Sequence, residues 1–448
     1  MLAACSFYQA YSLTTFHLIG EEIVAQEYEL DLQKDRQRIQ RIKSDLNVLF
    51  CVGAAFSALL SSSLINRLGR RPVIFGTEIL AVLNCLILII SDRRIMIVSR
   101  LVSGIVTGLM YVSFLMITEL LPRAIGGIAH SHGYSIYCAG ALIAYFMEYL
   151  IGHDEYAGYG REALCGTLIM SMIRMFMLCS LMNTESPVHI YDNCDHEDIF
   201  DKIRICYSKL FKKEFLNQAT FEFLRRQENA KRKLKHQKDN GIDTKGKLKT
   251  YMIGVIIGLA FHLTGINFFA FFLGGLLSKM DGSIRLAETS FWSAGLIGSL
   301  ISMFTINKYG RKHNLVWGSL LQCIAMVPVI LSYIQSNYNM MLAGLSVYAC
   351  CFGVSFGTTF TAKCTEMLSP AAFSCVICVK WMIAAGSFHL FGKISETNDQ
   401  TYILVTICAL NLVVFLVLSR FAVETKNKGN YEVQNKLDEA GLKKFDFT

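Results

Sequence analysis

Long apolar segments alternate with short polar ones along almost the whole chain. Most apolar segments are close to the roughly 20 residues that an α-helix needs to cross the hydrocarbon core of a bilayer. Six spans are predicted in the first half, at 2–20, 46–65, 72–91, 95–119, 128–151 and 163–183. Six more are predicted in the second half, at 251–278, 288–306, 313–335, 339–361, 372–394 and 401–421. The pattern therefore predicts an all-α membrane protein with twelve transmembrane helices.

The polar segments between the spans set the predicted boundaries. Residues 21–45 mix both signs of charge and are expected to form a solvated outer loop. The segment 188–250 is long, polar and basic, which predicts a cytosolic position because Lys and Arg are enriched in cytoplasmic loops. The predicted organisation is a six-helix bundle at 1–187, a cytosolic loop at 188–250, a second six-helix bundle at 251–421 and a cytosolic tail at 422–448.

A short basic turn occurs twice, as Asn66–Arg71 (Asn-Arg-Leu-Gly-Arg-Arg) and as Asn307–Lys312 (Asn-Lys-Tyr-Gly-Arg-Lys). In each copy the glycine permits the chain to reverse, and the basic residues mark the cytosolic side. Two glutamates per half follow in the same order and at the same separation of about 240 residues, namely Glu119 and Glu185, then Glu366 and Glu424. The chain is therefore expected to contain two pseudo-repeated six-helix bundles.

These charged residues are candidates for a gate at the cytosolic helix ends. We expect ion-pair latches that join Arg70 and Arg71 to Glu119 and Glu185 in the first half. The equivalent groups of the second half are Arg311, Lys312, Glu366 and Glu424. The alternative is that the basic turns only fix topology, as any inner loop can. Their repetition beside the two glutamates of each half favours the latch.

Composition agrees with a membrane protein and excludes several other classes. Hydrophobic residues make up 53% of the 448 residues and charged residues 17%, with a mean hydropathy of +0.40. The net charge of +8 suits basic inner loops, and no soluble basic domain that would bind nucleic acid is visible. No nucleophile–base pairing, metal-ligand spacing or phosphate loop occurs, so neither an enzyme nor a cofactor is expected. The fifteen cysteines are scattered through apolar runs as small hydrophobes.

Together the motifs resemble the sugar porter family of the major facilitator superfamily, with insect facilitated trehalose and glucose transporters as the closest likeness. The shared positions are the two basic turns, Arg100 with Gly104 and Gly108, Glu119 with Pro122, Glu185-Ser186-Pro187, Gly265-Ile266-Asn267, Glu366, and Glu424-Thr425-Lys426. The resemblance implies the major facilitator fold and alternating-access transport of a small polar solute, a sugar or a sugar-like compound. Proton-coupled family members carry an aspartate in the first span, and no acidic residue precedes Glu21 here, which favours facilitated diffusion.

The chain departs from the family where the solute is expected to bind. The family's paired glutamines of the seventh span are replaced by Phe261 and His262, and its fifth-span glutamine by Tyr134. The eighth-span asparagine corresponds to Gly295. The tenth span carries Ser355–Thr361 where the family has glycines and prolines, which predicts a weaker break in that helix because proline removes a backbone donor. The architecture is therefore implied more firmly than the solute.

The expected substrate pocket combines few polar groups with aromatic walls. Asn267 is the main retained amide, and we assign His262 and Tyr134 to the same pocket. Phe261, Phe271 and Phe272 are expected to form its walls. The alternatives are that Asn267 bonds a neighbouring helix and that His262 is a packing residue. So few hydroxyl partners predict a solute with fewer hydroxyls than a hexose, or a sugar bound with low affinity.

Two ionisable residues, Arg174 and Lys380, lie inside predicted spans. A charge at this depth costs on the order of a few kcal/mol unless it is paired or faces water, so both are functional candidates. The alternative is that each side chain snorkels to the membrane surface. The basic stretch 231–235 is either a solvated helix face or a contact with anionic membrane lipid.

Two other functions remain open at this stage. A sensor or receptor that keeps the fold without transport, or a transporter of a non-sugar organic solute, would each explain the missing sugar-binding amides. A channel is disfavoured because no filter-like ring of charges or carbonyls is visible. We expect a multi-pass protein of the plasma membrane rather than of an internal membrane.

Overall fold

The computed structural model describes residues 2–32, 34–88, 92–121, 123–151, 166–181, 185–194, 198–208, 211–239, 243–277, 280–394, 400–426, 428 and 433. Most of the predicted tail at 422–448 lies outside these residues, as do most side chains of the basic stretch 231–235. All regular secondary structure in the described residues is helical, which confirms the all-α prediction.

The helices of the first half follow the six predicted spans. A short 3-10 turn η1 (Leu2–Ala4) precedes α1 (Cys5–Tyr28), α2 (Arg36–Leu68), α3 (Arg70–Leu88), α4 (Arg93–Leu120), α5 (Arg123–Ile151) and α7 (Gly166–Leu181). In the second half, the seventh span consists of α11 (Asp243–Leu263), α12 (Ile266–Phe271) and α13 (Leu273–Leu277). It is followed by α14 (Ile284–Lys308), α15 (Arg311–Ile334), α16 (Tyr338–Phe352), the π-helical segment η2 (Gly353–Gly357), α17 (Thr358–Met367), α18 (Pro370–Ile394) and α19 (Thr401–Phe421). Within the described residues, nine segments are long and apolar enough to cross a membrane.

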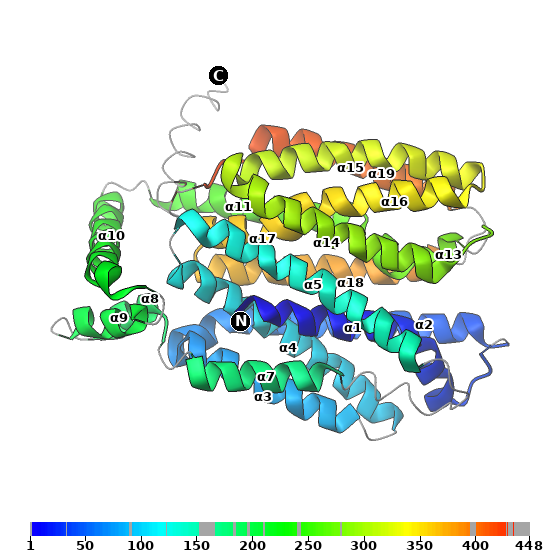
Figure 1. Cartoon of the computed structure of the whole chain (residues 1–448), viewed down its shortest axis with the longest axis horizontal. Helices are drawn as coiled ribbons and strands as arrows, with labels where there is room; N and C mark the ends of the chain where they lie inside the picture. Colours follow the sequence, from blue (N-terminus) through cyan, green and yellow to red (C-terminus); the bar gives the residue numbers. More distant parts are fainter. Residues whose placement is uncertain are drawn as a thin grey trace.

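The long helices run side by side along the length of the molecule, with the first-half helices (blue to cyan, and α7 in green) on one side and the second-half helices on the other (Figure 1). The halves meet where α2 packs against α18 and where α5 packs against α14. Large apolar side chains face outward, among them Phe176, Phe304 and Tyr402 at 72–80% exposure. An apolar exterior around a packed interior is the arrangement that a bilayer stabilises.

The prediction that residues 21–45 form a loop is wrong. Helix α1 continues to Tyr28 and α2 begins at Arg36, so only a short connection separates them. The helical ends are stabilised by an apolar cluster in which Ile19 and Ile23 of α1 meet Ile39 of α2. The charged residues of this segment occupy other faces of the same helices, which explains why mixed charge alone suggested a loop.

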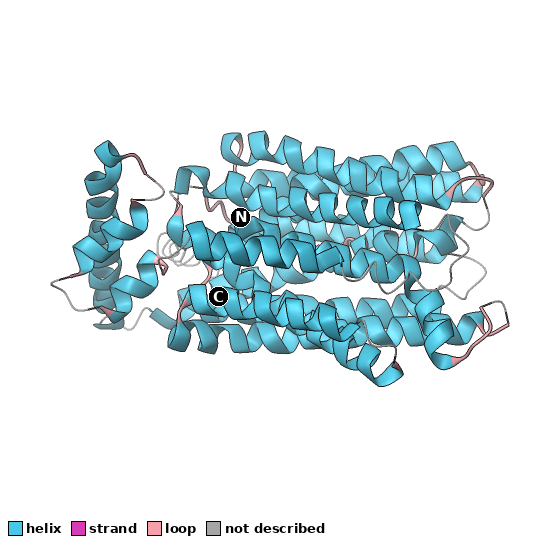
Figure 2. Cartoon of the chain, turned by 60° about the horizontal axis from the view of Figure 1, so that its bottom comes forward, coloured by secondary structure: helices cyan, strands magenta, loops and turns pink. Residues whose placement is uncertain are grey.

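The segment 188–250 is also more ordered than the predicted cytosolic loop. It contains α8 (Pro187–Asn193), α9 (Ile199–Tyr207) and α10 (Lys213–Asp239), and α11 begins at Asp243, earlier than the predicted span. These three helices gather at one end of the bundle, where α10 runs across the direction of the long helices (Figure 1 and Figure 2). Their shared apolar cluster contains Tyr191, Ile199, Ile203, Tyr207 and Leu216. This end also carries both basic turns, and we call it the basic end.

Candidate functional site

A central cavity of about 80 Å³ lies between the two halves. At about 10–15 Å³ for each enclosed water, this is room for roughly five to eight water-sized groups. Both halves contribute to the wall, through Ser6, Gln9, Leu13, Tyr111, Phe114, Gly133, Tyr134 and Tyr137 from the first, and Phe261, His262, Ile266, Asn267, Ala270, Phe271, Trp292, Phe352, Gly357, Phe360, Thr361, Lys380, Trp381 and Phe388 from the second. Five of the six predicted pocket residues are in this set, and Phe272 is not.

The break in the seventh span places Asn267 at the cavity. Gly265 has a φ of +88°, a conformation that favours glycine, and it ends α11 and starts α12. A Cβ atom added there would lie 2.7 Å from Ile407. The carbonyl oxygen of Thr264, freed by the break, accepts hydrogen bonds from the Tyr348 hydroxyl at 2.7 Å and from the Asn411 amide at 3.0 Å. The backbone is thus satisfied from neighbouring helices, while the Asn267 side chain remains directed to the cavity.

His262 and Asn267 contribute polar nitrogens without firm partners. Both side chains are buried, at 6% and 7% exposure. They are neighbours, but neither ring nitrogen of His262 nor the amide nitrogen of Asn267 makes a hydrogen bond of ordinary geometry. Buried polar groups are normally hydrogen-bonded, so these nitrogens are free to bind a solute.

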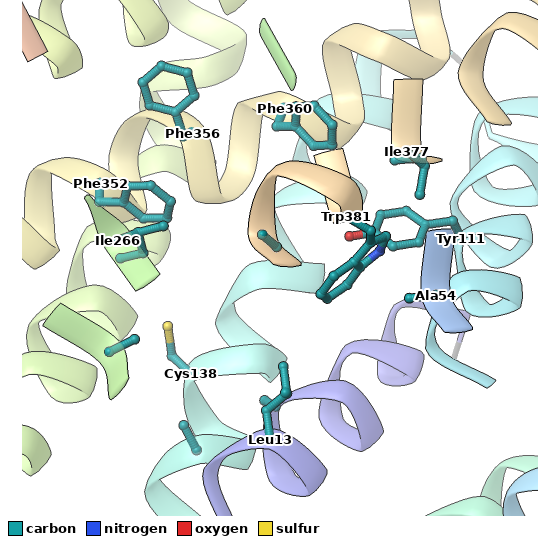
Figure 3. Close-up of a cluster of buried hydrophobic side chains, with 14 of the residues drawn as sticks. Leu13, Ala54, Tyr111, Cys138, Ile266, Phe352, Phe356, Phe360, Ile377 and Trp381 are labelled. Carbon is teal, nitrogen blue, oxygen red and sulfur yellow. The ribbon is translucent and has the colours of Figure 1, made fainter. Parts of the chain in front are cut away.

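Aromatic rings form most of the remaining wall. Phe261 lies edge-on to Phe352 and Phe360, with ring centroids 5.2 and 5.3 Å apart. Tyr134 stacks on Tyr137 at 5.8 Å. Phe352 and Phe360 line the cavity, and the ring of Phe356, which lies between them in the sequence, stacks on that of Phe352 at 6.1 Å (Figure 3). The rest of the wall therefore offers mainly ring faces and edges, with Gln9 as the one further amide among its described lining residues.

The π-helical segment η2 lies between two of these aromatic residues. The prediction of a weaker break in the tenth span agrees with the continuous helical path from Tyr338 to Met367. Within it, the wider turn of Gly353–Gly357 changes the helical register between Phe352 and Phe360. A π-turn inside an α-helix is frequent at functional sites.

Lys380 of α18, one of the two predicted intramembrane charges, lies in the same wall. Its Nζ donates a hydrogen bond to the Tyr111 hydroxyl at 2.8 Å, across the boundary between the halves. It also lies 4.1 Å from the ring centroid of Phe261, 5.2 Å from that of Phe360 and 5.2 Å from that of Trp381. In the described part of the chain, no carboxylate forms an ion pair with this ammonium group.

Arg174, the other predicted intramembrane charge, is not at the cavity. It lies on α7, and its Nη1 is 2.5 Å from a carboxylate oxygen of Glu78 on α3. Both side chains are buried. Glu78 was missed in the sequence, although a lone acidic residue inside an apolar span is the same signal that identified Arg174.

Phe272 packs behind the cavity rather than in its wall. It lies between α12 and α13, and its ring centroid is 6.0 Å from that of Phe391 and 6.4 Å from that of Phe268. Because the seventh span turns at this residue, the Phe272 side chain does not occupy the position that an uninterrupted helix would give it. Sequence reasoning also missed Tyr111, which only the fold brings to Lys380.

At the basic end, the structure joins the charged residues of the first half. The Arg70 guanidinium binds the Glu119 carboxylate in a bidentate manner, with its shortest contact at 2.8 Å. Ser186 donates a hydrogen bond to the same carboxylate. Glu185 accepts hydrogen bonds from the backbone N–H groups of Arg70 at 2.8 Å and Arg71 at 3.0 Å. Arg71 thus takes part through its backbone.

The second half repeats this arrangement. Arg311 binds Glu366 at 2.5 and 3.1 Å, and the Thr425 hydroxyl donates to the same carboxylate at 2.7 Å. Glu424 accepts from the backbone N–H groups of Arg311 and Lys312, both at 2.9 Å. The sequence repeat is therefore also a repeat of individual contacts.

The glycines of the basic turns are required by these contacts. Gly69 and Gly310 have φ values of +94° and +96°. A Cβ atom at Gly69 would lie 2.6 Å from a carboxylate oxygen of Glu185, and one at Gly310 would collide with the carboxylate of Glu424. In each half the turn therefore needs glycine both for its backbone conformation and for the close approach of a glutamate.

Backbone donors determine the charge state of Glu424. Burial acts to raise its pKa, but hydrogen bonds from the backbone N–H groups of Lys426, Arg311 and Lys312, with the nearby Lys363, bring the pKa below its ordinary value. The carboxylate is therefore ionised at neutral pH and continues to accept these hydrogen bonds.

The two Arg–Glu pairs beside the basic turns each join helices of a single half. Arg70–Glu119 connects α3 to α4, and Arg311–Glu366 connects α15 to α17. A neutral contact crosses between the halves instead: the His130 ring on α5 contacts the Thr365 hydroxyl on α17 at 3.3 Å, and the Thr118 hydroxyl of its own half at 2.9 Å. A second cavity of about 430 Å³ lies beneath these contacts, between the two halves and α10.

Contacts between the halves also close the opposite end. Arg285 on α14 lies 2.5 Å from Glu148 on α5, and His17 on α1 lies 3.3 Å from Glu288 on α14. The Ser44 hydroxyl donates to the carbonyl oxygen of Phe388 at 3.0 Å. The central cavity is therefore bounded by contacts between the halves on both sides.

Comparison with known proteins places this architecture among membrane transporters. The sequence profile of the "Sugar (and other) transporter" family matches residues 23–437. The chain is similar to the glucose transporter GlcP of Staphylococcus epidermidis, at 21% identity over 87% of each chain. It is also similar to the D-xylose-proton symporter of Escherichia coli, at 22% identity over 75% of this chain and 70% of the relative. The structure of the major facilitator proton:xylose symporter XylE bound to 6-bromo-6-deoxy-D-glucose superposes with a TM-score of 0.81, at 18% identity over 97% of this chain and 98% of XylE.

Proposed function

Because this chain belongs to the Sugar (and other) transporter family and has the major facilitator fold, we propose that it carries a small polar, sugar-like solute across a membrane by alternating access. It is an integral multi-pass protein of a transporter family, not an enzyme, as the sequence predicted. The predicted resemblance to insect trehalose transporters is not tested by the relatives described above. The observation that carries the proposal is the cavity between the halves, which His262 and Asn267 line with nitrogens that have no hydrogen-bond partner.

The contacts between the halves support a rocking mechanism. Hydrogen bonds and ion pairs join the halves on both sides of the cavity, and each half is braced internally by its own Arg–Glu pair. Each half therefore moves as one unit, and the weaker contacts at one end separate while those at the other end persist. The basic end faces the cytosol in this proposal, by the enrichment of Lys and Arg there.

Facilitated diffusion is the form of transport that the cavity favours. Among the described residues that line it there is no Asp or Glu, so the wall offers no carboxylate that could exchange a proton with each cycle. Glu21, the first acidic residue of the chain, lies 3.3 Å from Lys43 instead. Because one relative is named as a proton symporter, the uptake experiment varies the pH gradient.

Uptake into vesicles that contain the purified protein tests transport and coupling together. We expect saturable uptake of one or more labelled solutes among glucose, trehalose and polyols, with the same rate when a pH gradient is imposed or collapsed. A rate that follows the gradient would show proton coupling and contradict the facilitative mechanism. Impermeability to all of these solutes, together with solute-dependent stabilisation, would favour the sensor or receptor.

Asn267 and His262 test the position of the binding site. Asn267→Ala should lower saturable uptake by about tenfold or more, since one buried hydrogen bond to a solute contributes about 1–3 kcal/mol. His262→Gln should improve hexose uptake because it supplies an amide with both a donor and an acceptor. Asn193→Ala, an exposed change on α8, is the matched control and should have no effect. Unchanged uptake in Asn267→Ala would place the solute elsewhere.

We also propose the plasma membrane as the site of action. Surface labelling of intact cells should label the protein, and a tag inserted at 231–245 should remain inaccessible from outside. Access of an external antibody to that tag would reverse the proposed orientation.

A further inference from the structure

The ammonium group of Lys380 is the distinctive feature of the central cavity. Lys380 is 4% exposed and lies near the middle of α18, far from either end of this membrane span. Its one hydrogen bond in the described structure goes to the neutral hydroxyl of Tyr111, and aromatic rings surround it on the other sides. Cation–π contacts stabilise an ammonium group only partly, so its charge is not balanced within the protein.

Two other cations of the bundle have a carboxylate partner, whereas the buried Arg100 donates to the Asn47 side chain at 2.9 Å and lies over the Phe16 ring. Arg174 has the Glu78 carboxylate at 2.5 Å, and Lys43 has the Glu21 carboxylate at 3.3 Å. A buried charge without a counter-charge costs several kcal/mol, and proteins normally pair such groups. Lys380 differs from both in lying at the cavity, where an incoming molecule can supply the missing charge.

The rest of the cavity wall is also suited to an anion. No Asp or Glu is present among its described lining residues, so the wall holds a cation and no negative side chain. The unbonded Asn267 amide nitrogen is a hydrogen-bond donor, and one ring nitrogen of His262 donates while the other accepts. A neutral sugar could use these groups but would leave the Lys380 charge unbalanced.

We propose that the solute is a small hydroxylated carboxylate, such as a sugar acid or a hydroxy acid, whose carboxylate pairs with Lys380. This inference rests on the proposed transport function and specifies its substrate class. The carboxylate neutralises the ammonium group, Asn267 and His262 bind hydroxyls or the second carboxylate oxygen, and the rings of Phe261 and Trp381 cover the apolar face of the solute. A charge-assisted hydrogen bond in this dry site is stronger than a bond between neutral groups.

Matched pairs of solutes that differ by one carboxylate provide the test. Labelled glucuronate is compared with glucose, and glycerate with glycerol, by uptake into vesicles and by thermal stabilisation of the purified protein. In the native protein we expect at least one anion to exceed its neutral partner by about tenfold or more in uptake or in affinity. Lys380→Met should abolish this preference, and Lys202→Met, an exposed change on α9, should not. Asn267→Asp, which adds a carboxylate to the cavity, should also weaken binding of the anion.

The outcomes separate this inference from the proposed function. Uptake of the neutral solutes alone would support the transport function and overturn the inference that the solute is an anion. Anion-dependent stabilisation that disappears in Lys380→Met, without uptake of any solute, would support the inference and overturn transport. If the native protein neither binds nor takes up an anion, the inference is overturned. If Lys380→Met does not fold, Lys380→Gln takes its place, and an unchanged anion preference in either folded variant would also overturn it.

Discussion

Arg174 and Lys380 are both cations inside membrane spans, but the structure surrounds them differently. Arg174 lies between α7 and α3 at one side of the first half, where the Glu78 carboxylate is 2.5 Å away. Lys380 lies where the two halves meet and contacts a hydroxyl and aromatic rings. The first cation has its counter-charge within the fold, whereas the second is open to the cavity.

This difference shows what an intramembrane charge reveals by itself. The cost of burial identified both residues as candidates in the sequence, and that cost is the same physical signal in each case. Whether the charge has a structural or a binding role depends on its partner. For Arg174 the partner is a carboxylate on a helix of the same half, and for Lys380 we propose that it is the solute.

The largest effect is expected from breaking the paired site. Glu78→Gln should lower the free energy of unfolding by about 3–5 kcal/mol, because it leaves the buried Arg174 without a counter-charge. The double change Glu78→Gln with Arg174→Met should recover most of this loss. Denaturant unfolding of the purified protein measures both. Glu228→Gln, which breaks an exposed pair with Arg232 on α10, is the matched control and should cost less than about 0.5 kcal/mol. A similar small cost for Glu78→Gln would show that Arg174 does not depend on this pair.

At the cavity, removal of the charge is expected to raise the free energy of unfolding rather than lower it. Lys380→Met should raise the free energy of unfolding by about 1–3 kcal/mol in the absence of solute, because a flexible apolar side chain of similar length replaces an unbalanced charge. The loss of the hydrogen bond to Tyr111 offsets part of this gain. The same unfolding measurement decides the sign. A loss of stability comparable to that of Glu78→Gln would mean that the folded protein already balances the Lys380 charge.

The fold could be predicted because its main signal is local. Each span is an apolar segment of the required length, and the basic turns mark the repeat, so the helices follow the predicted spans. The errors arose where helices carry mixed polarity. In 21–45 and 188–250, charged residues share helices with narrow apolar faces, and average polarity conceals those faces.

The candidate site was only partly predictable because contacts between distant residues decide it. The family-like position of Asn267 and the aromatic residues near it could be found in the sequence, and the structure brings five of the six predicted residues to the cavity. The pairing of Glu78 with Arg174 and of Tyr111 with Lys380 depends on how helices pack, and one sequence does not contain that information. Phe272 was misplaced because the local turn between α12 and α13 redirects it.

The two Arg–Glu pairs of the basic end offer a finer comparison. Arg70 and Glu119 have side-chain exposures of 6% and 12%, whereas Arg311 and Glu366 have exposures of 1% and 8%. The Arg311 guanidinium also reaches the other half, since a Cβ atom at Gly127 of α5 would lie 2.9 Å from it. The second-half pair is therefore drier and closer to the boundary that must separate when the basic end opens.

The smallest predicted effect is a shift in the opening of the basic end. Glu366→Gln leaves the Arg311 charge unpaired at a dry boundary, and opening would hydrate that charge, so the inward-open population should rise by about tenfold, equivalent to about 1.4 kcal/mol. Glu119→Gln should act in the same direction but less, because the side chains of the Arg70–Glu119 pair are more exposed than those of the Arg311–Glu366 pair. Energy transfer between fluorescent amino acids placed at the exposed positions Leu68 and Tyr309 measures the separation of the two basic turns. Glu228→Gln is again the control. If Glu119→Gln opens the basic end as much as Glu366→Gln does, the lower exposure of the second-half pair has no role in closing the gate. If neither variant changes the separation, the pairs only brace their own halves, and the neutral contacts of His130 hold the basic end closed.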